Sequence, residues 1–341
     1  MFKLNALVYS EEYKKHDTGN HPENKERLSA IINSLKNEGI FNKIDCFSPE
    51  TATKEDILRV HSKEHVEYIK SFCESGGGYI DYDTFASPET YKIAKLAAGG
   101  AIKAADLVLD KYKSAYALVR PPGHHATGNK SMGFCIFNNL AIALEYLRHE
   151  RKIKKFFIFD FDVHFGNGTS EIFYNDPDVL YISIHQNPRT LFPGKGFVEE
   201  TGSGDGEGYN INIPMAPGST TDDYIYILDK ILEPAASKFN ADFYFMDNGF
   251  DGHVDDPLSS LALTDDFYEY IADKMMNISG SLALILEGGY NLDVLSRCNV
   301  KMINTLNNIS HENYKHELKV SENAKNTFNK IKDVFSPFYE F

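Results

Sequence analysis

Short apolar segments alternate with longer amphipathic segments along this chain, and this alternation limits the folds open to it. Each apolar segment is four to six residues long and has almost no polar side chain. A strand with one face in water would alternate apolar and polar residues, so these segments are typical of strands buried on both faces of a parallel sheet. We predict strands at Ala6–Tyr9, Tyr116–Val119, Phe156–Phe159, Val179–Ile184, Phe243–Met246 and Leu282–Leu286.

The segments between these strands have the length and composition of helices. Strands that alternate with helices indicate the α/β class, with a mostly parallel central sheet flanked by helices. No Pro/Ser-rich linker, repeat or low-complexity tract divides the chain, so we expect one domain over residues 1–341. Within it, the stretch from about 313 to 341 should form one or two helices packed on the body or on a partner. The other predicted helices are Pro22–Asn37, Pro88–Leu109, Asn138–His149, Asp222–Lys238 and Asp265–Ile278.

Charge and cysteine content exclude several classes of protein. Lys and Arg total 35 and Asp and Glu total 49, a net charge of −14, whereas sequence-independent nucleic-acid binding relies on Lys and Arg. The four cysteines are scattered and form no CxxC pair, which favours a reducing compartment. The chain has no run of about 18 apolar residues to span a membrane, and its first residues lack the apolar core of a signal peptide. We therefore expect a cytoplasmic protein that binds neither membranes nor nucleic acid directly.

The unusual polar residues come directly after four of the predicted strands. In open parallel sheets, ligands bind beyond the carboxyl ends of the strands, so side chains that follow several strands can meet at one rim. We therefore expect a single functional site built from all four groups. They are Arg120–His125, Asp160–His164, Asp247–Asp251 and Glu287–Tyr290.

The group Asp160-x-Asp162-x-His164 has the pattern of a metal site. Residues two apart on an extended segment point the same way, which would crowd two carboxylates and an imidazole together. A divalent cation makes such crowding tolerable, and ligands of this kind, completed by another Asp, suit Zn²⁺, Fe²⁺ or Co²⁺. A calcium loop that ends at Glu171 is the alternative, but Phe165 stands where that loop needs glycine. A plain structural turn is the other alternative.

The pair His124-His125 and the phenol of Tyr290 could act on a water at such a metal. Two imidazoles can supply a base and its electrostatic partner, and a phenol can donate to a developing oxyanion. Taken singly, each of these residues is more often structural. The sequence has no GxSxG nucleophile elbow, and Cys135 lies among apolar residues that disfavour its thiolate. Together the groups predict metal-assisted hydrolysis of an amide.

Six sequence runs resemble the histone deacetylase superfamily, from His21 to about Arg297. The resemblance implies the arginase/deacetylase fold, a single α/β domain with a mostly parallel sheet of about eight strands. It also implies zinc-dependent hydrolysis of linear amides, releasing acetate or another acyl group from acyl-lysine in peptides or proteins, or from small acylated amines. The runs are RPPGHH (Arg120–His125), GFCIFNN (Gly133–Asn139), DFDVHFGNGT (Asp160–Thr169), FPG (Phe192–Gly194), NGFDGHVDDPL (Asn248–Leu258) and EGGYNL (Glu287–Leu292).

The resemblance assigns roles residue by residue. Zn²⁺ would be held by Asp162, His164 and Asp251. His125 would be the general base and acid, with His124 as its electrostatic neighbour, and Tyr290 would stabilise the oxyanion. Asp160 would orient His124. Asn167 stands beside His125 where part of the family has Asp, and this weaker partner should leave His125 less basic.

Substrate and potassium sites follow from the same resemblance. Phe134 and Phe192 would wall a tunnel around the methylenes of an acyl-lysine. Other substrate contacts are expected at Gly133, Leu258, Asp83 and Gly288. Structural potassium would lie at an inner site formed by Asp160, Asp162, His164, Ser183 and Ile184, and at an outer site formed by Phe173, Asp176, Val179 and Tyr209.

This chain departs from the family pattern in ways that bear on its rate and specificity. Phe165 replaces a usual second His after the DxDxH run, and Asp247-Asn248 replaces a usual small Ser-Ala pair, where it could alter the outer shell of the metal. An apolar Leu258, where polyamine-selective relatives carry an acid, favours acyl-lysine substrates. An acetylpolyamine amidohydrolase remains the alternative enzyme, and a ureohydrolase or a non-catalytic acyl-lysine binding module are remoter ones. The sequence leaves monomer and homo-oligomer equally open.

Overall fold

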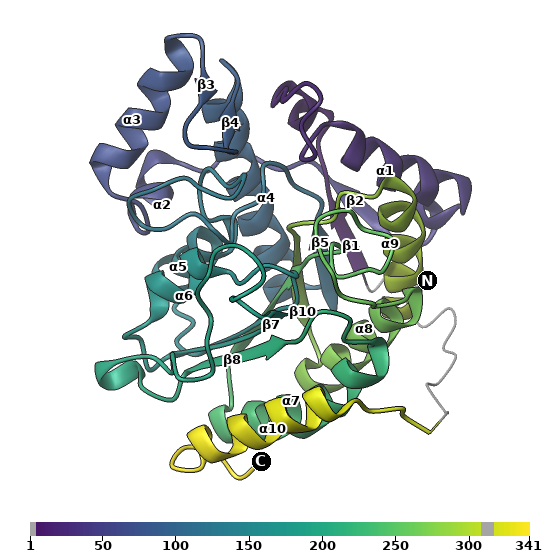
Figure 1. Ribbon diagram of the computed structural model, residues 1–341. Helices are drawn as coiled ribbons and strands as arrows, with labels where there is room; N and C mark the ends of the chain where they lie inside the picture. The colour runs from purple at the N-terminus through teal and green to yellow at the C-terminus, as the bar shows by residue number, and fades with distance from the viewer. Residues whose placement is uncertain (1–4, 308–316) are drawn as a thin grey trace.

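Eight parallel strands form the central sheet of the computed structural model, which describes residues 5–307 and 317–341. Every pair of neighbouring strands runs parallel. Helices flank this sheet (Figure 1), which confirms the predicted single α/β domain and its sheet of about eight strands. In spatial order the strands are β2 (Asp45–Phe47), β1 (Asn5–Val8), β5 (Ser114–Ala117), β10 (Leu282–Leu286), β9 (Phe243–Asn248), β6 (Phe156–Asp160), β7 (Val179–Gln186) and β8 (Asn210–Met215).

Two strands of the sheet were not predicted, and both lie at its edges. β2 has only three residues and no fully buried one, so it lacks an apolar signal. β8 reads NINIPM, and its asparagines break the apolar run. The amides of Asn210 and Asn212 both donate to the main-chain oxygen of Glu200, which ties the preceding loop to this edge strand. A short hairpin, β3 (Gly78–Tyr79) with β4 (Phe85–Ala86), forms a separate two-stranded sheet.

The predicted strand ends shift by a few residues, because main-chain pairing continues beneath polar side chains. β6 includes Asp160, and β9 includes Asp247 and Asn248. β5 begins two residues earlier than predicted, at Ser114, and ends at Ala117.

Ten α-helices occur in the described part of the chain, and all five predicted helical segments contain one. Their ends differ from the prediction by up to four residues: α1 begins at Glu26 rather than Pro22 because the chain turns at His21–Asn24. Four other helices were missed, of which α9 begins at the last residue of EGGYNL and is capped by the side chain of Asn291. The helices are α1 (Glu26–Asn37), α2 (Lys54–Leu58), α3 (Lys63–Glu74), α4 (Thr90–Asp110), α5 (Asn139–Glu150), α6 (Asn167–Phe173), α7 (Thr221–Phe239), α8 (Asp265–Ser279), α9 (Leu292–Leu306) and α10 (Glu322–Phe335).

The helices pack in groups around the sheet. α4 lies on β1, β5 and β10 and contacts α5, whereas α1, α9 and α8 pack side by side. Figure 1 shows α1, near the N-terminus, lying beside α9 from the last third of the chain. None of the described helices is long and apolar enough to cross a membrane.

The C-terminal segment carries one helix in its described part, α10. It packs on β8 and α7, as Figure 1 shows at the end of the chain. Thr327 donates to the carbonyl oxygen of Pro214 in β8 at 3.4 Å. α10 thus covers the edge strand, and the Thr327 hydroxyl provides a partner for one of its main-chain oxygens. Residues 313–316 of the predicted helical stretch lie outside the described residues.

The strand order explains how the four polar groups meet. The strands that precede them, β5, β10, β9 and β6, are four consecutive neighbours in the sheet. Because all four run parallel, their carboxyl ends lie at the same edge. This edge carries the candidate site.

Candidate metal and catalytic site

Asp162, His164 and Asp251 come together at the carboxyl ends of β6 and β9. The Nδ1 atom of His164 lies 3.1 Å from Asp162 Oδ1 and 3.2 Å from Asp251 Oδ2. One potential ligand atom from each residue lies within 4.8 Å of the others. Two ligands of a tetrahedral ion, each about 2.0 Å from it, are about 3.3 Å apart. The three side chains therefore fit one small divalent ion.

The electrostatics of this group also favour a cation. Burial and the neighbouring Asp162 carboxylate raise the pKa of Asp251 to about 6. Burial alone would lower the pKa of His164, but the carboxylates of Asp162 and Asp251 outweigh it and raise that pKa to about 10. Asp251 Oδ2 makes no hydrogen bond of good geometry with any described residue. The carboxylates of Asp162 and Asp251 thus face the same nitrogen of His164, where only one proton can bind. A bound divalent ion would take the place of that proton.

Glycines leave the room that these carboxylates occupy. The main-chain N–H of Gly288, after β10, donates to Asp162 Oδ2 at 2.7 Å. A Cβ atom at Gly288 would overlap the carboxylates of both Asp251 and Asp162, and one at Gly249 would overlap Asp162. The glycines of EGGY and NGFD are therefore required by the close approach of backbone to the ligands.

The Gly288→Ala variant is expected to bind zinc at least tenfold more weakly than the wild type, although all three ligands remain. The added methyl group must displace the Asp162 and Asp251 carboxylates, which a metal site tolerates poorly. Competition with a chromogenic chelator would measure the affinity. Gly280→Ala is the control: a Cβ atom there meets nothing within 4 Å, and the backbone strain from its φ of +67° lies at the exposed end of α8, away from the strand ends that carry the ligands. Equal zinc affinity in the Gly288→Ala variant and the wild type would contradict this description of the site.

The two adjacent histidines have different partners and opposite pKa shifts. His124 Nδ1 lies 3.1 Å from Asp160 Oδ2, which also accepts from the Tyr181 hydroxyl at 2.8 Å. Burial alone would lower the pKa of His124, but Asp162 and Asp160 hold it well above the usual value. His125 Nδ1 lies 2.8 Å from Asn167 Oδ1. Burial and the neighbouring His124 and His164 hold the pKa of His125 well below the usual value. One ring is therefore stabilised as a cation and the other as a neutral base.

Aromatic side chains pack against His125 and against Tyr290. The ring of Phe192 lies 5.0 Å from that of His125, and the ring of Phe134 lies 5.6 Å from that of Tyr290, both edge to face. Phe192 is 40% exposed, so it lies between the buried site and solvent. A Cβ atom at Gly133 would overlap His125, so the loop that carries Phe134 approaches the site closely.

The other predicted substrate residues lie on the surrounding loops. The carbonyl of Asp83 is 2.9 Å from His21 Nε2, and His21 packs against Phe134 with ring centroids 4.5 Å apart. Leu258 is half-buried on the loop after β9, and its N–H donates to Asp256. His21 therefore links Asp83 to the loop that carries Phe134. The contact with Asp256 holds Leu258 within the loop after β9, which also carries Asp251.

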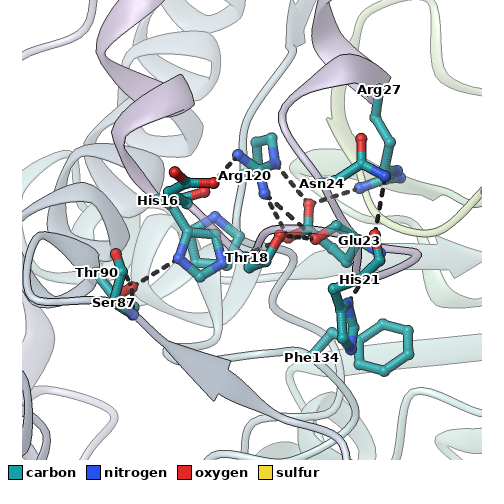
Figure 2. Close-up of polar contacts among 12 residues, drawn as sticks. His16, Thr18, His21, Glu23, Asn24, Arg27, Ser87, Thr90, Arg120 and Phe134 are labelled. Carbon is teal, nitrogen blue, oxygen red and sulfur yellow. Dashed lines mark hydrogen bonds and ion pairs between the residues drawn. The ribbon is translucent and has the colours of Figure 1, made fainter. Parts of the chain in front are cut away.

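Buried charges behind Tyr290 were not assigned a role from the sequence. Figure 2 shows Arg120 and Arg27 both directed at Glu23. Arg120 donates to the two carboxylate oxygens of Glu23 at 2.6 and 2.7 Å, and Arg27 donates to one at 3.2 Å. Arg27 also donates to the carbonyls of Glu287 at 2.5 Å and Gly289 at 2.7 Å, with its guanidinium 5.0 Å from the centre of the Tyr290 ring. Only their place in RPPGHH and in HPENKERL (His21–Leu28), the segment where the family resemblance begins, could have marked these residues.

The residues that depart from the family pattern lie behind the metal ligands. The Phe165 ring packs with its centre 4.9 Å from that of the His185 ring, and its apolar side chain offers no atom that could bind a metal. Asp247 and Asn248 are fully buried, and their side-chain oxygen and nitrogen atoms have no hydrogen-bond partner among the described residues. Asp247 is paired in register with Asp160. Asp247 therefore adds a buried carboxyl group beside Asp160, while Asp162, His164 and Asp251 lie close enough to share one ion.

The residues expected to bind potassium lie on β6 and β7, at the end of α6 and on the loops around them. Asp160, Asp162, Ser183 and Ile184 are all buried. The Ser183 hydroxyl lies 2.9 Å from His185 Nδ1. At the outer site, the carbonyl oxygens of Phe173, Asp176 and Tyr209 accept main-chain hydrogen bonds from Asp176, Val179 and Tyr181. The potassium sites stay a prediction.

A parallel α/β sheet with two carboxylates, an imidazole and a buried histidine pair at its carboxyl edge is the arrangement of a metal-dependent hydrolase. The family model described as "Histone deacetylase domain" matches residues 21–306 of this chain. The chain therefore belongs to the histone deacetylase family, a family of hydrolases, as the sequence runs predicted.

Relatives and solved structures agree with this assignment. A protein of Methanothermobacter thermautotrophicus named "Probable deacetylase" is 43% identical over 98% of this chain and all of its own length. A "Histone deacetylase-like amidohydrolase" of Pseudomonas aeruginosa is 35% identical, over 84% of this chain and 76% of its own. The crystal structure of the HDA15 HD domain is 33% identical and superposes with a TM-score of 0.92, over 98% of this chain and 95% of that one.

Proposed function

We propose that this protein is a zinc-dependent amidohydrolase that removes acetyl or other acyl groups from lysine-like amines. The observation that carries the proposal is the approach of Asp162, His164 and Asp251 to one point, beside the pair His124-His125. Asp162, His164 and Asp251 would hold the ion. When bound, a divalent ion supplies Lewis acidity, which activates a water molecule and polarises the amide carbonyl.

The general base would be His125, acting through its Nε2 atom. Asn167 Oδ1 can only accept a hydrogen bond, so it fixes the proton of His125 on Nδ1 and leaves the Nε2 lone pair free. A histidine with a pKa held low by its surroundings is neutral at pH 7 and able to take a proton from water. The same Nε2 atom would then return the proton to the leaving amine. His124, paired with Asp160, would supply positive charge beside it.

Tyr290 would donate a hydrogen bond to the oxyanion that forms during hydrolysis. Burial holds the pKa of its phenol well above the usual value even though Arg27 lies beside it. The phenol therefore keeps its proton at neutral pH and remains a donor. The rings of Phe134 and Phe192 would flank the methylenes of the substrate and keep water away from the reacting amide.

The test is acyl release by protein reconstituted with Zn²⁺. We expect acetate from an acetyl-lysine peptide, with a larger kcat/KM than for acetylated putrescine or spermidine, because Leu258 offers no charge to a polyamine. A chelator should abolish the activity and added Zn²⁺ or Co²⁺ should restore it. A reversed substrate preference would establish the acetylpolyamine alternative. Release of acyl groups from neither substrate with any divalent metal would refute the proposal.

A further inference from the structure

The peptide group between Gly289 and Tyr290 lies between two buried or nearly buried charges of opposite sign. Its carbonyl oxygen accepts from Arg27 Nε at 2.7 Å, and its N–H donates to Asp256 Oδ2 at 2.7 Å. Arg27 is fully buried, and Asp256 is 6% exposed. A cation at the oxygen and an anion at the N–H both match the dipole of the peptide group, and charge-assisted hydrogen bonds are about twice as strong as neutral ones.

Asp256 also holds the main chain of Asn291, the residue after Tyr290, and that of Leu258 on its own loop. Its Oδ2 atom accepts a second hydrogen bond, from the N–H of Asn291 at 3.0 Å, and its Oδ1 atom accepts from the N–H of Leu258 at 3.0 Å. One carboxylate therefore joins the loop after β9, which carries Asp251 and Leu258, to the loop after β10, which carries Tyr290. Asp256 was not among the residues assigned a role from the sequence.

The loop that carries Tyr290 needs such an anchor. Tyr290 follows two glycines, and Gly289 has a φ of +111°, a conformation open to glycine alone. Glycines leave a free loop many main-chain conformations, each of which would place the phenol differently. Oxyanion donors act only when they lie within hydrogen-bond distance of the position that the oxygen takes in the transition state.

We propose that Asp256 is a positioning residue that fixes the phenol of Tyr290 through the main chain of Tyr290 and Asn291. This inference rests on the proposed function, because it assigns the contribution of Asp256 to the oxyanion step. Among the described residues, Asp256 makes no hydrogen bond to Asp162, His164, Asp251, Phe134 or Phe192. It reaches the predicted substrate residue Leu258 only through that residue's N–H, so we expect its effect on turnover to pass through Tyr290.

The Asp256→Asn variant should lower kcat about ten- to a hundredfold, because misplacement of a reacting group by about 1 Å can reduce the rate by about a hundredfold. KM should change little. An asparagine offers one accepting oxygen, so it cannot accept from Leu258 on one side and from Tyr290 and Asn291 on the other. Zinc content should stay stoichiometric. Asp255→Asn is the matched control. The Asp255 carboxylate neighbours Asp256 in sequence, but it is 56% exposed and pairs with Arg297.

A double-mutant cycle separates this role from a merely structural one. In the Tyr290→Phe background, where no phenol remains to be positioned, Asp256→Asn should reduce kcat less than twofold further. Asp256→Glu, which keeps the charge but moves the carboxylate by one methylene, should give an intermediate loss in the wild-type background. Full additivity of the two substitutions, or a kcat unchanged in Asp256→Asn, would overturn the proposal.

A measurement without catalysis distinguishes failure of this inference from failure of the proposed function. With 3-fluorotyrosine placed at position 290, the ¹⁹F spectrum of the zinc-loaded protein should show one sharp resonance in the wild type and in Asp255→Asn. In Asp256→Asn the resonance should split or broaden as the ring takes several positions. An unchanged spectrum would overturn the positioning role even if the enzyme is active, whereas an altered spectrum in a protein without acyl-releasing activity would refute only the proposed function.

Discussion

The Asp251→Ala variant is expected to fold but to purify without a stoichiometric divalent ion and without measurable amidohydrolase activity. Asp251 supplies one of the three potential ligands and comes from a different strand end from the other two. Without it, Asp162 and His164 form a two-ligand site from a single segment, which is short of the three protein ligands that catalytic zinc sites use. Elemental analysis after dialysis against trace metal measures the loss directly.

Folding should survive this substitution because the wild-type site brings together carboxylates that repel each other. Burial and Asp162 already raise the pKa of Asp251 to about 6, so its removal relieves an unfavourable charge. The side chain does accept the N–H of Val163 at 3.0 Å, and Asp251→Asn tests whether that bond matters. Asp255→Ala, four residues along the same loop and exposed, is the control and should retain zinc. Stoichiometric zinc in Asp251→Ala would remove Asp251 from the ligand set.

The Tyr290→Phe variant is expected to keep its metal and lose turnover by about a hundredfold or more. Removal of one oxyanion donor typically costs about 3–4 kcal/mol of transition-state stabilisation. The ring itself should stay in place, because its contacts with Phe134 and Arg27 involve no hydroxyl. The loss should therefore appear in kcat rather than in KM or zinc content, measured by acetate release under saturating substrate.

A tyrosine at the other end of the sheet provides the control for this substitution. Tyr244 lies near the start of β9, at the opposite end of the strand from Asp251. Tyr244→Phe should leave kcat within twofold of the wild type. If Tyr290→Phe also keeps a kcat within twofold of the wild type, the phenol does not take part in the reaction. The EGGY run would then have only a structural role in this chain.

Much of the sheet and of the site could be predicted from the sequence because both depend on local patterns. The apolar segments mark strands buried on both faces, and the polar groups directly after them mark strand ends. Their meeting required only that β5, β10, β9 and β6 be neighbours, which the parallel sheet provides. β2 and β8 were missed because edge strands are short or carry polar side chains, here Asn210 and Asn212.

The supporting charges could not be predicted in the same way. Glu23, Arg27 and Asp256 look like ordinary surface residues in a sequence, since charged side chains are seldom buried. Their burial is tolerated because they are paired, and several of the partners are distant in the chain: Arg27 bonds to a carbonyl 262 residues away. Without knowledge of the fold, a single sequence does not show which of these residues lie next to each other. The conformation of the Tyr290 loop, and with it the role proposed for Asp256, therefore came from the structure.

Anomalous X-ray diffraction from crystals of the zinc-loaded protein tests the central claim most directly. We predict a single strong zinc peak between Asp162 Oδ1, His164 Nδ1 and Asp251 Oδ2, with bonds of about 2.0–2.2 Å. Two other groups of potential ligands exist among the described residues, His124 with Cys135 and Glu287, and His253 with Asp265 and Cys298. A peak at either of these groups, with none between Asp162, His164 and Asp251, would contradict the proposed metal site and the hydrolytic mechanism built on it.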